Sequence, residues 1–269
     1  MSIYKMICLD IDGTLLNSNH EISTNTVDKI NELCNEKNIK VILVSARMKK
    51  GIDFIQKKLH IKQPIVCYSG AEVLDENYNL ITNKYIDFNL AIDIIKESKN
   101  KNIHVSLYND NNWIIEKMDK WSQIEKDITG IIPEIEDINC DEFINKYKNG
   151  FNKILLIEEP KRINEIKNIL IDRYSEYLNI YQSKPTYLEI MNKSVSKTEA
   201  IKEIMNMYDI KQEEIIAVGD NFNDMDMIKF AAVGVAMGNA PDMVKEISDY
   251  VTLSNDEDGV AVVIEKYFD

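Results

Sequence analysis

Two aspartates spaced by one residue follow an apolar segment near the start of the chain, in the sequence CLDIDGTLL. The preceding residues, IYKMICL, predict a buried strand, and side chains alternate along a strand, so Asp10 and Asp12 should lie on one side where it ends. An unpaired carboxylate beside a hydrophobic core is costly, which predicts a compensating partner. Two converging carboxylates suit a hard divalent cation such as Mg²⁺; solvated aspartates at a turn are the simpler alternative.

A second acidic cluster follows a late apolar segment, in the sequence GDNFNDMDM. Asp220 comes directly after the predicted strand, and Asn223 and Asp224 lie at the predicted start of a helix. Ligands of open α/β sheets bind beyond the carboxyl ends of the strands, so we expect Asp220 to join Asp10 as a Mg²⁺ ligand, with Asn223 and Asp224 shaping the site. Because Asn and Asp are also good helix N-caps, a purely capping role is the alternative.

Two other segments offer hydrogen-bond donors to a phosphate group. Gly13 allows a tight turn, after which Thr14 presents a hydroxyl and a backbone N–H. Ser45 ends another predicted strand, in VSARM, so its hydroxyl and the neighbouring N–H groups of Ala46 and Arg47 are candidate phosphate donors. A strand-ending serine in an ordinary turn is the alternative.

Basic residues near these segments are candidate partners for an anion. Lys197, in SVSKTEA, begins a predicted helix, and the positive end of a helix already favours anions. A single helical lysine is normally solvated, and Arg47 could contact substrate or form a surface ion pair. These residues therefore indicate an anion site only in combination with the aspartates.

The candidate residues require a sheet that brings several strand ends to one edge. Apolar runs of strand length alternate with helical patterns, which is typical of an α/β fold with a parallel sheet. A first helix is predicted over 23–37, with Ser23 or Thr24 as its N-cap. The predicted strands of this part cover 3–9, 40–45, 64–70, 214–220, 231–238 and 249–253, and a helical tail ends the chain.

The middle of the chain is richer in Asn, Lys, Glu and aromatic residues and has its own strand candidates, at 104–109, 113–116, 153–158 and 177–182, with a helix at 161–173. It contains no Gly/Ser-rich linker and no convincing repeat, so it predicts a compact α+β insertion. We therefore expect a Rossmann-like core formed by residues 1–83 and 187–269 and an inserted domain at 84–186.

Composition narrows the class of ligand. The chain has 32 Lys and Arg against 45 Asp and Glu, a net charge of −13, which argues against nucleic acid or anionic membrane as a partner. Four cysteines without a C-x-x-C pair and only three histidines argue against a cysteine–histidine zinc site and fit a reducing compartment. No run approaches the roughly 20 apolar residues of a membrane span, and no signal-peptide pattern is present, so we expect a cytoplasmic protein.

In the order and spacing of its motifs, the sequence resembles the haloacid dehalogenase (HAD) superfamily of phosphohydrolases, and more closely its Cof-type branch, subfamily IIB, with the large insertion called a C2B cap. The resemblance covers nearly the whole chain and rests on DIDGTLLNS, VSAR, SVSKTEA, GDNFNDMDM, VAMGNA and LSNDEDGVA. Arg47 follows Thr14 too closely for a cap between them, whereas the interval from Arg47 to Lys197 has room for one. The resemblance implies a HAD-type catalytic core and a cap domain that sets substrate specificity.

The resemblance also implies a role for each candidate residue. Asp10 would be the nucleophile that forms an aspartyl-phosphate, and Asp12 the acid that protonates the leaving alkoxide and then the base that deprotonates water. It further implies that Mg²⁺ binds Asp10, the backbone carbonyl of Asp12 and Asp220, that Thr14, Ser45, Ala46, Arg47, Lys197 and Asn223 lie around the phosphoryl group or substrate, and that Asp224 supports Lys197 or the metal shell.

Three positions depart from the family's pattern. Ser45 begins a Ser-Ala-Arg sequence where the family usually has Thr-Gly-Arg, and serine keeps the hydroxyl. Ser-Gly-Ala at 69–71 stands where Asn-Gly-Ala is frequent, and Thr198 replaces the glycine that usually follows the lysine. No departure removes a group that the chemistry requires.

We therefore expect a Mg²⁺-dependent phosphatase of small phosphorylated metabolites, with sugar phosphates, pyridoxal phosphate or flavin mononucleotide as candidate substrates. A phosphomutase of the same superfamily would reuse the aspartyl-phosphate. A catalytically silent, phosphometabolite-binding regulator would show damage at Asp10, Asp12, Lys197 or Asp220, all of which are present. We expect a monomer or weak homodimer.

Overall fold

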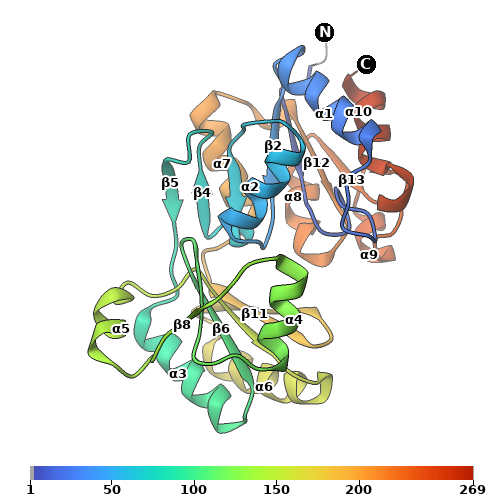
Figure 1. The fold of residues 1–269 in the computed structure, drawn as a ribbon. Coiled ribbons are helices and arrows are strands. Elements are labelled where there is room, and N and C mark those ends of the chain that lie inside the picture. The colour runs from blue at the N-terminus through green and yellow to red at the C-terminus, as the bar shows by residue number, and fades with distance from the viewer. Residues whose placement is uncertain (1–2, 269) are drawn as a thin grey trace. The chain divides into compact units, whose positions relative to one another are not determined.

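The structure is a computed structural model that describes residues 3–268 (Figure 1). The chain divides into two compact units. The first contains the residues up to Arg47, Ile52–Thr82 and the residues from Ser196 onward; the second contains Met48–Gly51 and Asn83–Val195.

The sheet of the first unit is largely parallel. Its strands are β1 (Met6–Leu9), β2 (Lys40–Val44), β3 (Ile65–Cys67), β4 (Glu72–Leu74), β5 (Leu80–Asn83), β12 (Ile215–Gly219), β13 (Val233–Ala236) and β14 (Tyr250–Val251). Within the described residues they form an eight-stranded sheet in the order β14-β13-β12-β1-β2-β3-β4-β5. Neighbouring strands from β14 to β3 pair in parallel, and β4 turns back antiparallel to β3. The predicted α/β class is confirmed, and the carboxyl ends of β1, β2 and β12 meet at one edge.

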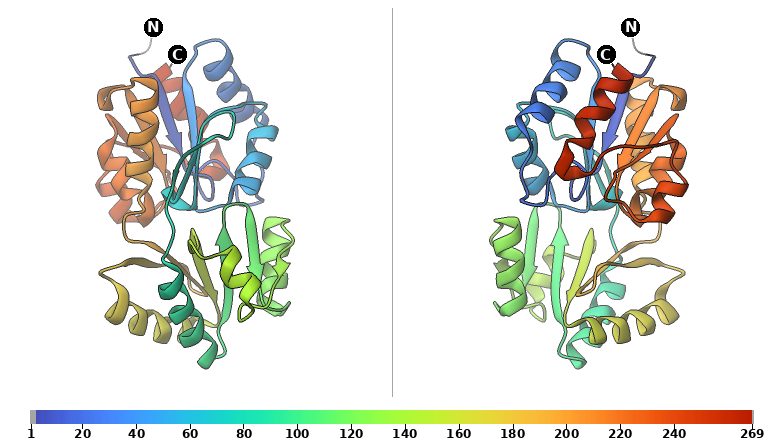
Figure 2. Two further views of the ribbon diagram at one scale, coloured as in Figure 1. Left: turned by 90° about the vertical axis from the view of Figure 1, so that its left-hand side faces the viewer. Right: turned by 90° about the vertical axis from the view of Figure 1, so that its right-hand side faces the viewer.

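Helices cover both faces of this sheet (Figure 2). They are α1 (Thr24–Asn35), α2 (Lys49–Lys58), α7 (Lys197–Tyr208), α8 (Met225–Phe230), α9 (Asp242–Glu246) and α10 (Gly259–Phe268), with 3₁₀ turns η1 (Tyr68–Gly70), η2 (Gln212–Glu214), η3 (Phe222–Asp224) and η4 (Asn255–Glu257). Apolar residues of α7 and α8, including Ile201, Ile204 and Met227, pack with Cys8 and Ala217 of the strands. Helices α1 and α10 lie side by side on the opposite face.

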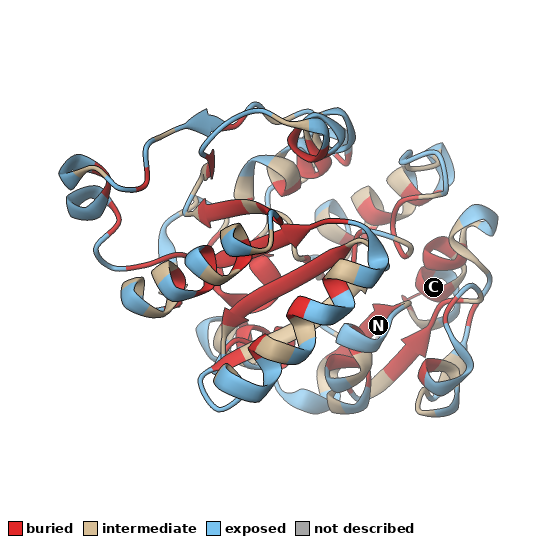
Figure 3. Ribbon diagram, turned by 90° about the horizontal axis from the view of Figure 1, so that it is seen from below, coloured by how far each residue is buried: buried red, intermediate tan, exposed pale blue. Residues whose placement is uncertain are grey.

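The second unit has an α+β architecture. Its strands are β6 (His104–Asn109), β7 (Asn112–Ile115), β8 (Glu134–Ile135), β9 (Lys153–Ile157), β10 (Leu178–Lys184) and β11 (Tyr187–Asn192), and its helices are α3 (Phe88–Asn100), α4 (Lys120–Thr129), α5 (Asp141–Lys146) and α6 (Pro160–Tyr174). The sheet order is β10-β11-β9-β6-β7-β8, antiparallel except for β7 with β8. Ile94 and Ile163 of the helices share one core with Leu107 of β6 and Ile154 of β9. The long central strands of this sheet are mostly buried, drawn red in Figure 3, whereas β8 is exposed.

The second unit ends later in the sequence than expected. Residues Tyr187–Asn192 form β11, which pairs antiparallel with β9 and β10. A core that resumes at 187 would divide this hairpin, so the break falls at Ser196 instead.

Other element boundaries shift by a few residues. β1 begins at Met6 rather than at residue 3, and Ile3 is largely exposed. Ser23 is the N-cap of α1, and its hydroxyl accepts a hydrogen bond from the Thr26 N–H at 3.1 Å. Among the described residues, none of the helices has both the length and the apolar character that a membrane span requires.

Candidate active site

Three predicted site residues follow directly after neighbouring strands of the first unit. Asp10 follows β1, Ser45 follows β2 and Asp220 follows β12. The backbone N–H of Asp10 donates to the Val218 carbonyl at 3.1 Å, which continues the pairing of β1 with β12 past its last residue. The parallel register therefore places these three side chains at one edge of the sheet.

Lys197 is buried between two carboxylates. It is the first residue of α7, whose N-cap Ser196 accepts a hydrogen bond from the Glu199 N–H. Its Nζ lies 2.5 Å from Asp10 Oδ1 and 2.6 Å from Asp224 Oδ1. Burial opposes the charge of the ammonium, but the two carboxylates outweigh burial and raise the pKa of Lys197. Lys197 is therefore a fixed cation at the strand ends.

Asp224 ties this ion pair to the loop after β12. It is fully buried at the junction of η3 and α8. Its Oδ2 accepts hydrogen bonds from the backbone N–H groups of Asp220 at 3.1 Å and Asn221 at 3.0 Å, while its Oδ1 binds Lys197. One carboxylate thus orients both the lysine and the backbone that carries Asp220.

Asp220 is held against the turn that follows β1. Its Oδ1 accepts a hydrogen bond from the Thr14 hydroxyl at 3.0 Å, so this hydroxyl serves a carboxylate within the protein. Gly13 has φ +87°, and a Cβ on it would lie 2.4 Å from Asp220 Oδ2. Only glycine combines this backbone conformation with this close approach.

The site carries more negative charge than its lysine compensates. Burial, followed by the charge of Asp224, raises the pKa of Asp220 to about 6. Burial also raises the pKa of Asp10 well above its ordinary value, although Lys197 acts in the opposite direction. Each of Asp10, Asp220 and Asp224 offers an oxygen, and these oxygens all lie within 4.8 Å of one another. Carboxylate oxygens are the ligands of hard divalent cations, so this donor set fits Mg²⁺.

Asp12 is directed to a different partner. Its carboxylate forms a bidentate ion pair with Arg47, with Nε to Oδ2 at 2.8 Å and Nη2 to Oδ1 at 2.6 Å. The Asp12 side chain is 51% exposed, whereas that of Asp10 is 9% exposed. The sequence left open whether Arg47 contacts substrate or forms an ion pair. The structure shows an ion pair, and its partner Asp12 is itself a predicted site residue.

The remaining predicted residues surround this cluster. Ser45 is buried, and its hydroxyl oxygen accepts a hydrogen bond from the Arg47 N–H at 3.2 Å, with half-buried Ala46 between them. Asn223 is exposed in η3, next to buried Asp224. Asn239, which was not among the predicted site residues, donates from Nδ2 to the Gly13 carbonyl at 2.9 Å. The motif VAMGNA, which contains Asn239, was its only sequence signal.

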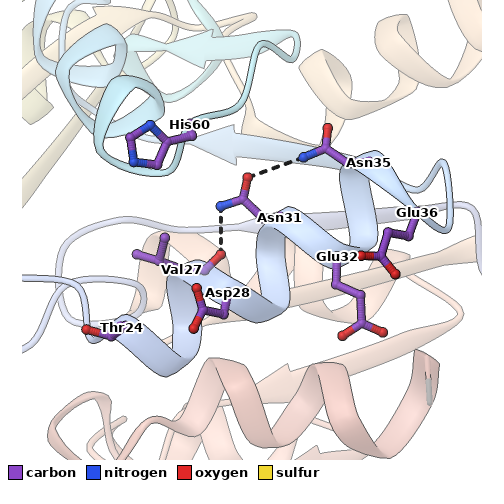
Figure 4. A pocket seen from close by; sticks show the side chains of 8 residues that line it. All are labelled: Thr24, Val27, Asp28, Asn31, Glu32, Asn35, Glu36 and His60. Atoms are coloured by element: carbon purple, nitrogen blue, oxygen red, sulfur yellow. Dashed lines mark hydrogen bonds between the residues drawn. The ribbon is translucent and has the colours of Figure 1, made fainter.

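A hollow elsewhere on the first unit is unsuited to a phosphate group. It has a volume of about 600 Å³ and lies along α1, with Asp28, Glu32 and Glu36 in its lining (Figure 4). The Asn31 amide in its wall donates to the carbonyls of Val27 and Leu59. None of its eight lining residues is a lysine or an arginine that could offset these three carboxylates, whereas the strand-end cluster contains Lys197, so the strand-end cluster is the candidate phosphate site.

Comparisons with known proteins agree on a family. The sequence profile of the haloacid dehalogenase-like hydrolases matches residues 7–264. A Bacillus subtilis protein named 5-amino-6-(5-phospho-D-ribitylamino)uracil phosphatase YcsE is 33% identical over 260 residues, which cover 97% of this chain and 94% of that protein.

Solved structures resemble the chain over almost its whole length. A haloacid dehalogenase-like hydrolase from Bacteroides thetaiotaomicron has a TM-score of 0.89 and 29% identity, over 98% of this chain and all of that one. TM0651 from Thermotoga maritima has a TM-score of 0.86 and 36% identity, over 98% of this chain and 97% of that one.

Proposed function

Because the chain belongs to the haloacid dehalogenase-like hydrolases, we propose that it is a Mg²⁺-dependent phosphatase that acts on small phosphorylated metabolites through an aspartyl-phosphate. The observation that carries this proposal is the buried Asp10–Lys197–Asp224 array beside Asp220 at the strand ends. It combines a carboxylate nucleophile, a fixed cation and an acidic cation site within one edge of a sheet.

In the first half of the proposed reaction, an Asp10 carboxylate oxygen attacks phosphorus and the bond from phosphorus to the substrate oxygen breaks. Asp12 gives its proton to the leaving alkoxide. In the second half, Asp12 takes a proton from water, and the resulting hydroxide attacks the aspartyl-phosphate and releases Asp10 and phosphate. Arg47 donates to both oxygens of the Asp12 carboxylate and so positions it; one of these two hydrogen bonds must break when Asp12 takes up the proton, while the other can keep Asp12 in place.

Donors for the transferred group come from three segments. Lys197 supplies positive charge beside the attacking carboxylate, and Ser45 at the end of β2 and Asn223 in η3 supply hydrogen-bond donors. Hydrogen-bond donors that are already in place before the reaction stabilise the charge that is redistributed in the transition state.

Mg²⁺ fits the excess of carboxylates at this edge. We assign its protein ligands to Asp10, Asp220 and the backbone carbonyl of Asp12, with Asp224 in support. When bound, the ion would offset the repulsion between Asp10 and a phosphate dianion.

We further propose that the second unit is a cap domain that selects the substrate. The net charge of −13 supports a small phosphorylated metabolite rather than nucleic acid or an anionic membrane as the partner. The named activity of YcsE supports adding a phosphorylated ribitylamino-pyrimidine to the sugar phosphates, pyridoxal phosphate and flavin mononucleotide as candidate substrates. The four cysteines are free thiols, which supports a reducing, cytoplasmic location.

The test is phosphate release from this panel with Mg²⁺ or with EDTA, for wild type, Asp10→Asn and the exposed-carboxylate control Asp172→Asn. We expect release that requires Mg²⁺, persists in Asp172→Asn and is lost in Asp10→Asn. Formation of an isomeric phosphate ester without release would indicate a phosphomutase, and binding without turnover would indicate a regulator. Either result would contradict the proposal.

A further inference from the structure

We propose that the turn Tyr68–Gly70 is a positioning element that sets the Ser45–Arg47 segment and the start of α7 relative to each other. The proposal rests on the proposed function, because these two segments carry Ser45, Arg47 and Lys197. The turn itself supplies no group to the chemistry.

The backbone of the turn has an unusual conformation over three successive residues. Tyr68, Ser69 and Gly70 have φ values of +49°, +55° and +110°. Left-handed backbone is uncommon for residues other than glycine, and both Tyr68 and Ser69 are buried. Such a conformation persists only where the surrounding contacts require it, so the contacts of the turn identify its purpose.

Two backbone N–H groups of the turn hold the segment after β2. The Tyr68 N–H donates to the Arg47 carbonyl at 3.0 Å, and the Ser69 N–H donates to the Ser45 carbonyl at 2.8 Å. These bonds fix the carbonyl groups of Ser45 and Arg47, the residues on either side of Ala46. They thereby fix the backbone that carries the Ser45 hydroxyl and the Arg47 side chain, which binds Asp12.

Gly70 holds the start of α7 by direct backbone contact. A Cβ at Gly70 would lie 2.4 Å from the Ser196 carbonyl oxygen and 3.3 Å from Ala200 Cβ. Ser196 is the N-cap of α7, and the next residue is Lys197. This close approach therefore sets the position of the first residues of α7. It thereby sets the backbone position from which the Lys197 side chain reaches Asp10.

The left-handed turn makes both sets of contacts possible at once. It directs the N–H groups of Tyr68 and Ser69 to the Ser45–Arg47 segment. It also places the Cα of Gly70, which carries no side chain, against Ser196. Among residues with a side chain, Asn tolerates left-handed backbone best, and Ser69 adopts it with φ +55° although its side chain favours it less. We infer that Ser69 is kept in a costly conformation because the position of the site depends on it.

The first test compares Gly70→Ala with Gly130→Ala. Gly130 also has a positive φ, +69°, but it caps α4 in the second unit and has no atom within 4 Å of the Cβ position. Both variants impose left-handed backbone on alanine, and only Gly70→Ala pushes on Ser196. For p-nitrophenyl phosphate with Mg²⁺, we expect kcat/KM to fall at least tenfold in Gly70→Ala and to stay within twofold of wild type in Gly130→Ala.

A milder pair separates backbone conformation from crowding in case Gly70→Ala does not fold. Ser69→Thr and Ser69→Asn add nearly the same volume, but β-branched Thr disfavours left-handed backbone whereas Asn tolerates it. We expect kcat/KM to fall several-fold or more in Ser69→Thr and to stay within twofold in Ser69→Asn. Equal losses in the two variants, or a Gly70→Ala variant as active as Gly130→Ala, would overturn the proposal.

A crystal structure of Gly70→Ala, or of Ser69→Thr if the former does not fold, separates this proposal from the proposed function. We expect displacement of the Ser45–Arg47 segment or of Ser196, with loss of the 2.5 Å contact from Lys197 Nζ to Asp10. Unchanged positions would overturn the positioning role even if the wild type is a phosphatase. Absence of phosphate release by the wild type would contradict the proposed function. The displacement in the crystal structure of the variant would then decide the positioning proposal by itself.

Discussion

Lys197 Nζ lies 2.5 Å from Asp10 Oδ1, although the two residues are 187 positions apart in the chain. The contact joins the first residue of a helix to the end of a strand, and both side chains are buried. Charge at this depth is tolerated only when it is paired and hydrogen-bonded. The ion pair is therefore both a stability determinant and the centre of the candidate site.

Replacement of the lysine should reveal the stability role. Lys197→Met leaves Asp10 and Asp224 buried without their cation, and breaking a buried pair in this way costs about 3–5 kcal/mol. We expect urea denaturation at pH 7 to show a loss of this size. The control Lys202→Met, in the same helix with an exposed partner, Glu199, should lose less than about 1 kcal/mol. Similar losses in the two variants would contradict a buried, charge-bearing role for Lys197.

Removal of the Asp12 carboxylate should affect catalysis more than stability. General acid–base catalysis contributes about 10²–10⁴-fold, so we expect Asp12→Asn to reduce kcat by a factor in this range. Because the side chain is 51% exposed, the free energy of unfolding should change by less than about 1 kcal/mol. Steady-state kinetics and urea denaturation of the same preparation check both statements. Wild-type kcat in this variant would remove Asp12 from the mechanism.

Arg47 should act on catalysis through Asp12. Lysine keeps the charge at position 47 but cannot form the bidentate pair that places both Asp12 oxygens. We expect Arg47→Lys to lower kcat/KM for p-nitrophenyl phosphate about tenfold. The control Arg173→Lys, which alters an ion pair with Glu97 in the second unit, should leave it unchanged.

A double variant distinguishes positioning from direct substrate binding. If Arg47 acts through Asp12, Arg47→Lys should have little further effect in an Asp12→Asn background, because neighbouring groups that act together are not additive. If instead the fold losses in kcat/KM of the two single variants multiply in the double variant, Arg47 acts in substrate binding and not through Asp12.

The sequence predicted those parts of the site that depend on strand ends. Asp10, Ser45 and Asp220 each follow an apolar run, and a parallel sheet necessarily brings such positions to one edge. Lys197 was predicted at a helix start, and Ser196 is the observed N-cap. These features are local in sequence, so pattern and capping rules capture them.

Features set by long-range contacts were not predicted. The Asp12–Arg47 pair depends on the path of two loops, and the Thr14 hydroxyl reaches Asp220 across 206 positions. β11 was missed because Glu189 interrupts its apolar pattern. Buried Glu189 lies 3.4 Å from Lys153 of β9, a partner that only the assembled sheet provides.

The site should bind Mg²⁺ in competition with protons. The pKa of Asp220 is raised to about 6 from an ordinary value of 3.8, and that of Asp10 is raised in the same direction. The native state therefore takes up protons before the unfolded chain does as the pH falls. Without metal, the stability that Asp220 contributes is fully present below about pH 4 and is lost as the pH rises through about 6, and the raised pKa of Asp10 gives a contribution of the same sign.

Mg²⁺ should reverse this loss of stability at neutral pH, where Asp220, with its pKa of about 6, is ionised. At a hundredfold excess over its Kd, a ligand specific for the native state stabilises by about 2.7 kcal/mol, which corresponds to a rise in Tm of several degrees. We expect this rise at pH 7.5 and a clearly smaller one at pH 5 in thermal denaturation. Asp220→Asn should lose the response and Asp172→Asn should keep it, whereas a response of equal size at both pH values would place Mg²⁺ away from these carboxylates.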